Sequence, residues 1–206
     1  MVITIGREYG SGGKYIGEQL SKKLGIKLYH KELLKKVSEE ENIDIHLLEA
    51  NDERKQDDFW STALLSYPSV TALNEISNNE KAFIKTAKVI QHLADTEDCI
   101  IIGRCSNKIL KDHKDVLNVF IYATDMSFKV KRKMELDNLS EKDTIKKIKK
   151  MDKERATNYK YHVDGNWGNK TEYDLCIDTS KVGIENAIKL IETYYNLKKQ
   201  SKITEE

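Results

Sequence analysis

The clearest chemical signal in the sequence is a glycine-rich stretch near the N-terminus, which reads GREYGSGGK over residues 6–14. It follows an apolar, strand-like run and leads into a helix-like run that stops at Gly25. Glycines let backbone N–H groups surround a phosphate, and the start of a helix adds a partial positive charge. Arg7 and Lys14 can supply full positive charges. A strand, a glycine-rich turn and a helix in this order predict a cradle for nucleotide phosphates.

The stretch departs from the usual P-loop pattern, which is G-x-x-x-x-G-K-[ST]. Counted back from Gly13-Lys14, Glu8 stands at the first glycine position and Tyr15 at the Ser/Thr position. The alternative interpretation is a glycine-rich turn that merely lets a strand meet a helix. If the stretch is a cradle, the residues expected to bind the nucleotide are Arg7, Gly10, Ser11, Gly12, Gly13, Lys14 and Tyr15.

Two further candidates stand where strand-like runs end. Arg104 follows the apolar run 99–102, and His30 follows the run 26–29. Open α/β sheets bind ligands at the carboxyl ends of their strands, and the planar arginine side chain suits bidentate phosphate binding. The alternatives are an arginine at a helix start paired to an acid, and a histidine that is a surface or capping residue.

Length, charge and cysteine content limit the classes of protein to which this chain can belong. The 206 residues suit one domain, and the net charge of +1 implies no general attraction to nucleic acid or to membranes. The three cysteines show no metal-binding spacing, which fits a reducing, cytoplasmic location. We expect no signal peptide, because the N-terminal strand leads straight into the cradle. No apolar run is long enough to span a bilayer.

The periodicity of apolar residues predicts an α/β fold. Five short strands separated by helices indicate a parallel sheet with right-handed crossovers. The predicted strands are 2–5, 26–29, 99–102, 116–122 and 173–177. The predicted helices are 13–24, 31–41, 44–58, 80–97, 125–137, 140–159 and 183–197. A polar tail, 198–206, is expected to fray, and Pro68 is expected in a loop between helices.

Several of these stretches together resemble one family. They are ITI at 3–5, GSGG at 10–13, LGI at 24–26, IIIGR at 100–104 and YDLCIDTS at 173–180. Over about residues 1–195 the chain resembles the cytidylate kinase-like family, a branch of the P-loop nucleoside monophosphate kinases. The resemblance implies a three-layer P-loop NTPase fold in one domain, 1–197, with strand order 2-3-1-4-5. It also implies a helical region at about 31–97 that binds the nucleoside monophosphate, and a lid at about 140–172.

The resemblance further implies an ATP-dependent kinase that uses Mg²⁺, with CMP or dCMP as the leading acceptor. By this analogy Lys14, Arg104 and Arg155 are catalytic. The acceptor-binding candidates are His30, Arg104, Lys153 and Arg155, with Lys160 in reserve. Lid arginines close over phosphates in these kinases, which is why Arg155 is preferred within the basic segment 129–160. Trp167 is expected to pin the lid, and stacking on a base is the alternative. Small-molecule nucleotides are the expected partners of a monomer or homodimer.

Two departures from the family keep alternatives open. Without gaps, the family's cradle lysine aligns with Gly13 and its magnesium-binding serine with Lys14; a one-residue shift places Tyr15 at the serine instead. Magnesium would then need Ser11, a distant carboxylate or water, so no residue is assigned as a metal ligand. Cys105 replaces an acidic residue. The alternatives to a cytidylate kinase are a catalytically weak nucleotide sensor and a kinase of another small metabolite.

Overall fold

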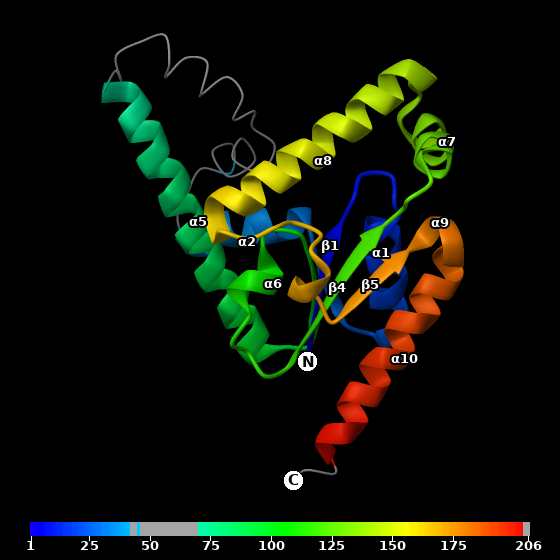
Figure 1. The fold of residues 1–206 in the computed structure, drawn as a ribbon. Helices are drawn as coiled ribbons and strands as arrows, with labels where there is room; N and C mark the ends of the chain where they lie inside the picture. Colours follow the sequence, from blue (N-terminus) through cyan, green and yellow to red (C-terminus); the bar gives the residue numbers. More distant parts are fainter. Residues whose placement is uncertain (42–44, 46–69, 204–206) are drawn as a thin grey trace.

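The computed structural model describes residues 1–41, 45 and 70–203. The strands in this part of the chain form one parallel sheet in the order β2-β3-β1-β4-β5, which confirms the expected fold class and strand order (Figure 1). The strands are β1 (Val2–Arg7), β2 (Lys27–Tyr29), β3 (Cys99–Ile102), β4 (Val116–Tyr122) and β5 (Leu175–Asp178).

Helices cover both faces and one end of this sheet. Their bounds are α1 (Gly13–Leu24), α2 (Lys31–Glu41), α5 (Val70–Thr96), α6 (Ser106–Ile109), α7 (Met126–Asp137), α8 (Glu141–Val163), α9 (Thr179–Val182) and α10 (Ile184–Ile203), with a short 3₁₀ turn η1 (Lys170–Glu172). The predicted helix 44–58 and the predicted loop around Pro68 lie outside the described residues.

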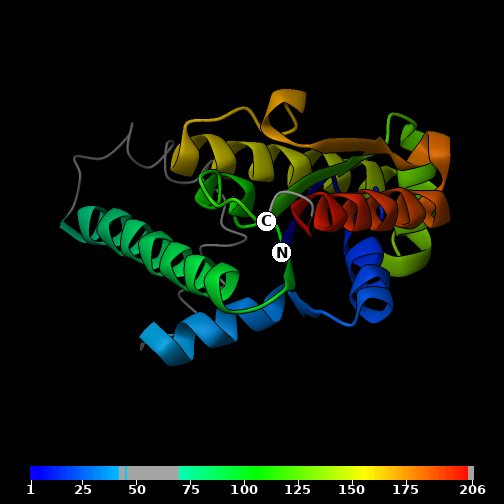
Figure 2. The same cartoon turned by 90° about the horizontal axis from the view of Figure 1, so that it is seen from below.

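The alternation of side chains along the strands divides the core into two clusters. On β3, Cys99 and Ile101 face α2 and α5, whereas Ile100 and Ile102 face α1 and α10. All four β3 side chains are buried, as expected of a parallel strand covered on both faces. In Figure 2, α2 and α5 lie side by side on the left, and α1 and α10 lie together on the right.

The first helix explains why the glycine-rich turn has a fixed geometry. Ile16 and Leu20, one turn apart, are fully buried against the sheet. The helix starts after Gly12, which has φ 93°, and it ends at Gly25, which has φ 67° and donates its N–H to Ser21. The predicted bounds of this helix, 13–24, are therefore confirmed.

Three predicted helix boundaries differ from the structure by four residues or more. Helix α5 begins at Val70, ten residues before the predicted start. Helix α8 continues to Val163, although its predicted N-cap, Ser140, does accept a hydrogen bond from the Asp143 N–H. The last helix continues to Ile203, so the first six residues of the predicted tail are helical. Lys198 contacts Val116 at 2.5 Å, which fixes part of this extension to the sheet.

Helix α8 runs across the end of the sheet, above β1 and β4, and α7 lies at one of its ends (Figure 1). This arrangement leaves the glycine-rich turn beneath α7 and α8. Among the described residues, no helix has the length and apolar character needed to cross a membrane.

Candidate functional site

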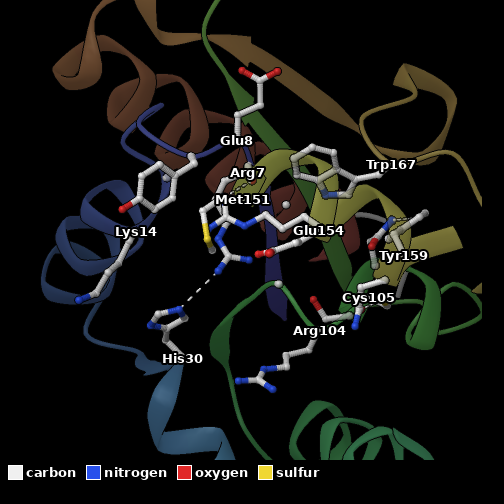
Figure 3. A pocket seen from close by; sticks show the side chains of 18 of the residues that line it. Arg7, Glu8, Lys14, His30, Arg104, Cys105, Met151, Glu154, Tyr159 and Trp167 are labelled. Atoms are coloured by element: carbon white, nitrogen blue, oxygen red, sulfur yellow. Dashed lines mark hydrogen bonds between the residues drawn. The ribbon is translucent and has the colours of Figure 1, made fainter. Parts of the chain in front are cut away.

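A single cavity of about 510 Å³ collects most of the residues singled out in the sequence. Its wall combines the glycine-rich turn after β1, the turn after β3, and side chains from α2, α5, α7 and α8 (Figure 3). Its position, at the carboxyl ends of β1 and β3, is where parallel α/β sheets bind ligands. The volume suits a small organic ligand.

The turn 8–12 has the open backbone geometry that a phosphate cradle requires. Gly10 and Gly12 have φ of 88° and 93°, which only glycine adopts without strain. Ser11 is fully buried, and its hydroxyl shares a hydrogen bond between the carbonyls of Glu8 and Ile121, at 2.9 and 3.0 Å. The Ser11 side chain therefore braces the turn from inside the protein, whereas Gly10, Gly12 and Gly13 line the cavity.

Three side-chain hydrogen bonds hold the turn in place. The Glu8 carboxylate accepts hydrogen bonds from the Ala123 N–H at 3.1 Å and from Lys129 at 3.0 Å. The buried Thr179 hydroxyl donates to the Ser11 carbonyl at 2.8 Å. Because both ends are fixed to β4, α7 and α9, the turn is preorganised before any ligand binds.

Arg7 lies at the centre of the cavity, and Lys14 lies at its side (Figure 3). An Arg7 Nη atom is 3.4 Å from His30 Nε2. The Lys14 side chain is 62% exposed and pairs with Glu18, one turn further along α1, at 3.3 Å. Tyr15 also lines the cavity, with the Arg132 guanidinium 5.6 Å from its ring centre. Arg7 therefore occupies a more enclosed position than Lys14.

His30 and Arg104, which follow β2 and β3, both line the cavity. Arg104 follows Gly103 in a left-handed turn in which three consecutive residues have φ of 77°, 61° and 54°. Non-glycine residues adopt this conformation at a cost, and such strain is common at functional sites. Burial and the nearby positive charges of Arg7 and Arg104 lower the pKa of His30 to about 4. His30 is therefore neutral at physiological pH.

Helix α8 contributes Arg155 to the cavity wall and places Asp152 against the glycine-rich turn. Arg155 Nη1 donates to the Arg7 carbonyl at 3.0 Å, and Asp152 accepts from the Tyr9 N–H at 2.6 Å. Burial, reinforced by the charge of Glu8, raises the pKa of Asp152 to about 6. The Tyr9 ring, in turn, lies against the cations of Lys133 (4.4 Å) and Arg155 (5.6 Å).

The other basic candidates differ in position. Lys153 and Lys160 are exposed on α8, and among the described residues neither belongs to the cavity wall. Arg132 and Lys133 of α7 do belong to it, although sequence reasoning did not single them out. One signal could have found Arg132. The chain has only five arginines, and four of them line this cavity: Arg7, Arg104, Arg132 and Arg155.

The part of the cavity beyond Arg104 is lined by ring and amide side chains. The rings of Phe83 on α5 and His162 on α8 stack at 4.1 Å. Asn107 donates to the Tyr159 hydroxyl at 2.8 Å. Trp167 lies edge-on to Phe120 of β4, with the ring centres 5.3 Å apart. These groups could contact the uncharged part of a ligand.

The donor set fits an anionic phosphate chain. Seven Lys or Arg side chains line the cavity against three Glu side chains. The cavity does not resemble a metal site built from protein side chains alone. In residues 1–41, 45 and 70–203, no group of three His, Cys, Asp or Glu side chains is arranged so that it could hold a metal ion. Kinases bind Mg²⁺ through one or two carboxylates together with the substrate phosphates. Glu18 and Glu154 are carboxylates on the cavity wall that could take that part.

Comparison with known proteins agrees with this geometry. The sequence model of the cytidylate kinase-like family matches residues 2–181. An uncharacterized protein from Eubacterium ventriosum has a similar structure, with 29% identity, a TM-score of 0.72, and coverage of 95% of this chain and 98% of that chain. Shikimate kinase from Bacteroides thetaiotaomicron shares the fold, with 12% identity, a TM-score of 0.54 and the same coverage of both chains. No match was found among curated proteins.

Proposed function

Because the chain belongs to the cytidylate kinase-like family, we propose that it transfers the γ-phosphoryl group of ATP to a nucleoside monophosphate, with CMP and dCMP as the first acceptors to test. One observation carries the proposal. The preorganised glycine turn, Arg104 after β3 and Arg155 from α8 all line the same cavity, so groups suited to a donor phosphate chain and to an acceptor phosphate face one another.

The glycine turn supports the donor side of this proposal. Its backbone N–H groups and the start of α1 supply positive potential for the β- and γ-phosphates of ATP. Magnesium would enter as the chelate of ATP and neutralise part of the phosphate charge. The family and the fold indicate the use of ATP, and the protein's own part is to bind and orient the phosphate chain.

The acceptor side rests on Arg104. Its strained left-handed backbone aims a charged side chain into the cavity beside His30, which is neutral. A guanidinium there suits the dianionic phosphate of a monophosphate acceptor. In-line phosphoryl transfer needs no covalent nucleophile, since positioning and charge stabilisation provide the rate. Arg155 would stabilise the charge that spreads over the transferring group.

The test is a panel of ribo- and deoxynucleoside monophosphates incubated with Mg-ATP, with diphosphate measured by chromatography. We expect diphosphate from CMP or dCMP at the highest kcat/KM. The Arg104→Ala variant should raise the acceptor KM and lower kcat, together by roughly 100-fold in kcat/KM, since it removes a charged contact in a partly enclosed site. Lys111→Ala, an exposed charge loss shortly after the same turn, is the matched control.

The two alternatives are outcomes of the same experiment. ATP binding without diphosphate from any nucleotide would replace the kinase proposal with a nucleotide sensor. Consumption of ATP only with a hydroxyl-bearing metabolite in a second panel would identify a kinase of another small acceptor. Equal kinetics of Arg104→Ala and the unaltered protein would overturn the role given to Arg104.

A further inference from the structure

The two residues that flank the turn, Arg7 and Gly13, differ from the usual P-loop pattern in a complementary way. When Gly12 is taken as the second glycine of G-x-x-x-x-G-K, the first glycine position holds Arg7 and the lysine position holds Gly13. This register places the start of α1 at the lysine position, because Gly13 is the first residue of the helix. A charge is missing at position 13, and a charge is added at position 7.

These two residues are in contact. A Cβ atom added to Gly13 would lie 2.6 Å from Arg7 Cβ and 3.0 Å from Arg7 Cγ. The stem of the Arg7 side chain therefore fills the space that a side chain at position 13 would need. Any larger residue at position 13 would have to displace it, since Cβ atoms do not approach so closely.

The far end of Arg7 lies against the turn after β3. A Cβ added to Gly103 would lie 2.1 Å from Arg7 Nη1, so the guanidinium lies directly against the turn that presents Arg104. The Arg7 side chain thus extends from Gly13, the first residue of α1, to Gly103, which precedes Arg104. Figure 3 shows it crossing the middle of the cavity toward His30.

Lys14 does not have this geometry. Successive residues of a helix are turned by about 100°, so the side chain one position after Gly13 leaves the helix in another direction. Lys14 is mostly exposed and pairs with Glu18 on the flank of α1.

We propose that Arg7 takes the part of the P-loop lysine and contacts the β- and γ-phosphates of ATP, and that position 13 is a glycine because the stem of the Arg7 side chain fills the space beside it. This inference rests on the proposed function. Arg155 holds the Arg7 backbone by donating to its carbonyl, and His30 Nε2 lies 3.4 Å from an Nη atom of the Arg7 guanidinium. His30 and Arg155 are positioning residues for Arg7 in this arrangement.

The test measures the affinity for ATP by isothermal titration calorimetry, which does not depend on turnover. The variants are Arg7→Gly, Gly13→Lys, and the double variant Arg7→Gly/Gly13→Lys, which restores G-x-x-x-x-G-K. Lys14→Ala tests the rival lysine, and Lys22→Ala, exposed in the last turn of α1, controls for the loss of a surface charge. Circular dichroism and thermal melting establish that each variant is folded.

We expect Arg7→Gly to weaken ATP binding by at least about 30-fold, the loss typical of removing one partner of an enclosed charge contact. Gly13→Lys alone should also weaken binding, because it displaces Arg7. The double variant should recover at least about tenfold over Arg7→Gly, and Lys14→Ala should lose less than tenfold.

Three results would overturn the inference: ATP affinity of Arg7→Gly within threefold of the unaltered protein, a loss in Lys14→Ala as large as that in Arg7→Gly, or a double variant no better than Arg7→Gly. Failure of the unaltered, folded protein to bind ATP at all is a different result. It would overturn the proposed function, and the role of Arg7 with it.

Discussion

Arg155 Nη1 donates a hydrogen bond to the backbone carbonyl of Arg7 at 3.0 Å, so a side chain from the middle of α8 is bonded to the last residue of β1. The contact joins residues 148 positions apart in the sequence. It connects α8 to the end of β1, and it also holds the backbone of Arg7, whose side chain lies in the cavity. We therefore propose that Arg155 acts on a bound phosphate both directly and through Arg7.

We predict that Arg155→Ala lowers kcat by roughly 10- to 100-fold, because it removes a charge from the cavity and leaves the Arg7 carbonyl without this donor. Arg155→Lys should recover part of the loss, since lysine restores the charge without the planar set of donors. Steady-state kinetics with Mg-ATP and the best acceptor measure both. The matched control is Lys149→Ala, an exposed charge loss on the same helix. Unchanged kcat in Arg155→Ala would exclude both roles.

Asp152 gives a prediction about stability and pH. Its pKa, raised to about 6 chiefly by burial, lies above the usual value of 3.8. A raised carboxyl pKa favours the protonated form in the folded state. Its contribution to stability is complete below about pH 4 and is lost as the pH rises through about 6. Over that interval Asp152 should lower the free energy of unfolding by up to about 3 kcal/mol.

Asp152→Asn should remove this dependence, because the amide stays neutral and its oxygen can still accept from the Tyr9 N–H. Denaturant unfolding at pH 4.5, 5.5 and 7 measures the difference between the two proteins. The free energy of unfolding of Asp152→Asn, relative to that of the unaltered protein, should increase as the pH rises. A difference that stays constant across the three pH values would show that Asp152 does not titrate in this range.

The glycine turn gives a prediction with an internal control. Gly10 (φ 88°) and Gly25 (φ 67°) both have left-handed backbones, so alanine should cost each about 1–2 kcal/mol. A Cβ at Gly10 would also lie 3.0 Å from Lys129 Cβ and 3.2 Å from its carbonyl, whereas a Cβ at Gly25 would meet nothing within 4 Å. Gly10→Ala should therefore weaken ATP binding by roughly tenfold or more, and Gly25→Ala should lower only the thermal stability. Similar ATP affinities in the two variants would contradict the cradle.

Much of the fold could be predicted from the sequence because local patterns determine it. The buried run Cys99–Ile102 and the spacing of Ile16 and Leu20 indicate a strand and a helix without any knowledge of their neighbours. Gly25 marks the helix end because its backbone must be left-handed there. The extension of α10 through polar residues could not be predicted in this way, since contacts such as that of Lys198 with β4 come from distant parts of the chain.

The sequence predicted which segments form the site, but it predicted less completely which individual side chains enter the cavity. Both alignments of the turn place a cation near α1, yet a shift of one residue turns a side chain by about 100° around the helix. Local sequence does not show that Arg7 fills the space over Gly13, since that contact depends on how the loop folds back. Arg132 was missed because it lies among lysines on α7 and enters the site only through the packing of that helix.

The pKa of His30 reports on burial and positive charge in the cavity. Burial and the charges of Arg7 and Arg104 lower its pKa to about 4, well below the usual 6.5. A lowered histidine pKa means that its contribution to stability is present above pH 6.5 and is lost as the pH falls through about 4. The imidazole Hε1 resonance, assigned by its loss in His30→Gln, should stay at its neutral position down to about pH 5 in an NMR titration. Arg7→Gly should raise the midpoint, and titration of His30 near pH 6.5 in the unaltered protein would show that neither burial nor the guanidiniums lower its pKa.

The central claim is that this cavity moves a phosphoryl group from ATP to a nucleoside monophosphate. The most direct measurement is a ³¹P NMR time course of Mg-ATP with CMP, with the Arg104→Ala variant in a parallel sample. We predict that the γ-phosphate signal of ATP falls while the α- and β-phosphate signals of CDP rise in equal amount, and that the variant is far slower. Steady ATP and CMP signals, or release of inorganic phosphate alone, from a protein that binds ATP would contradict the claim.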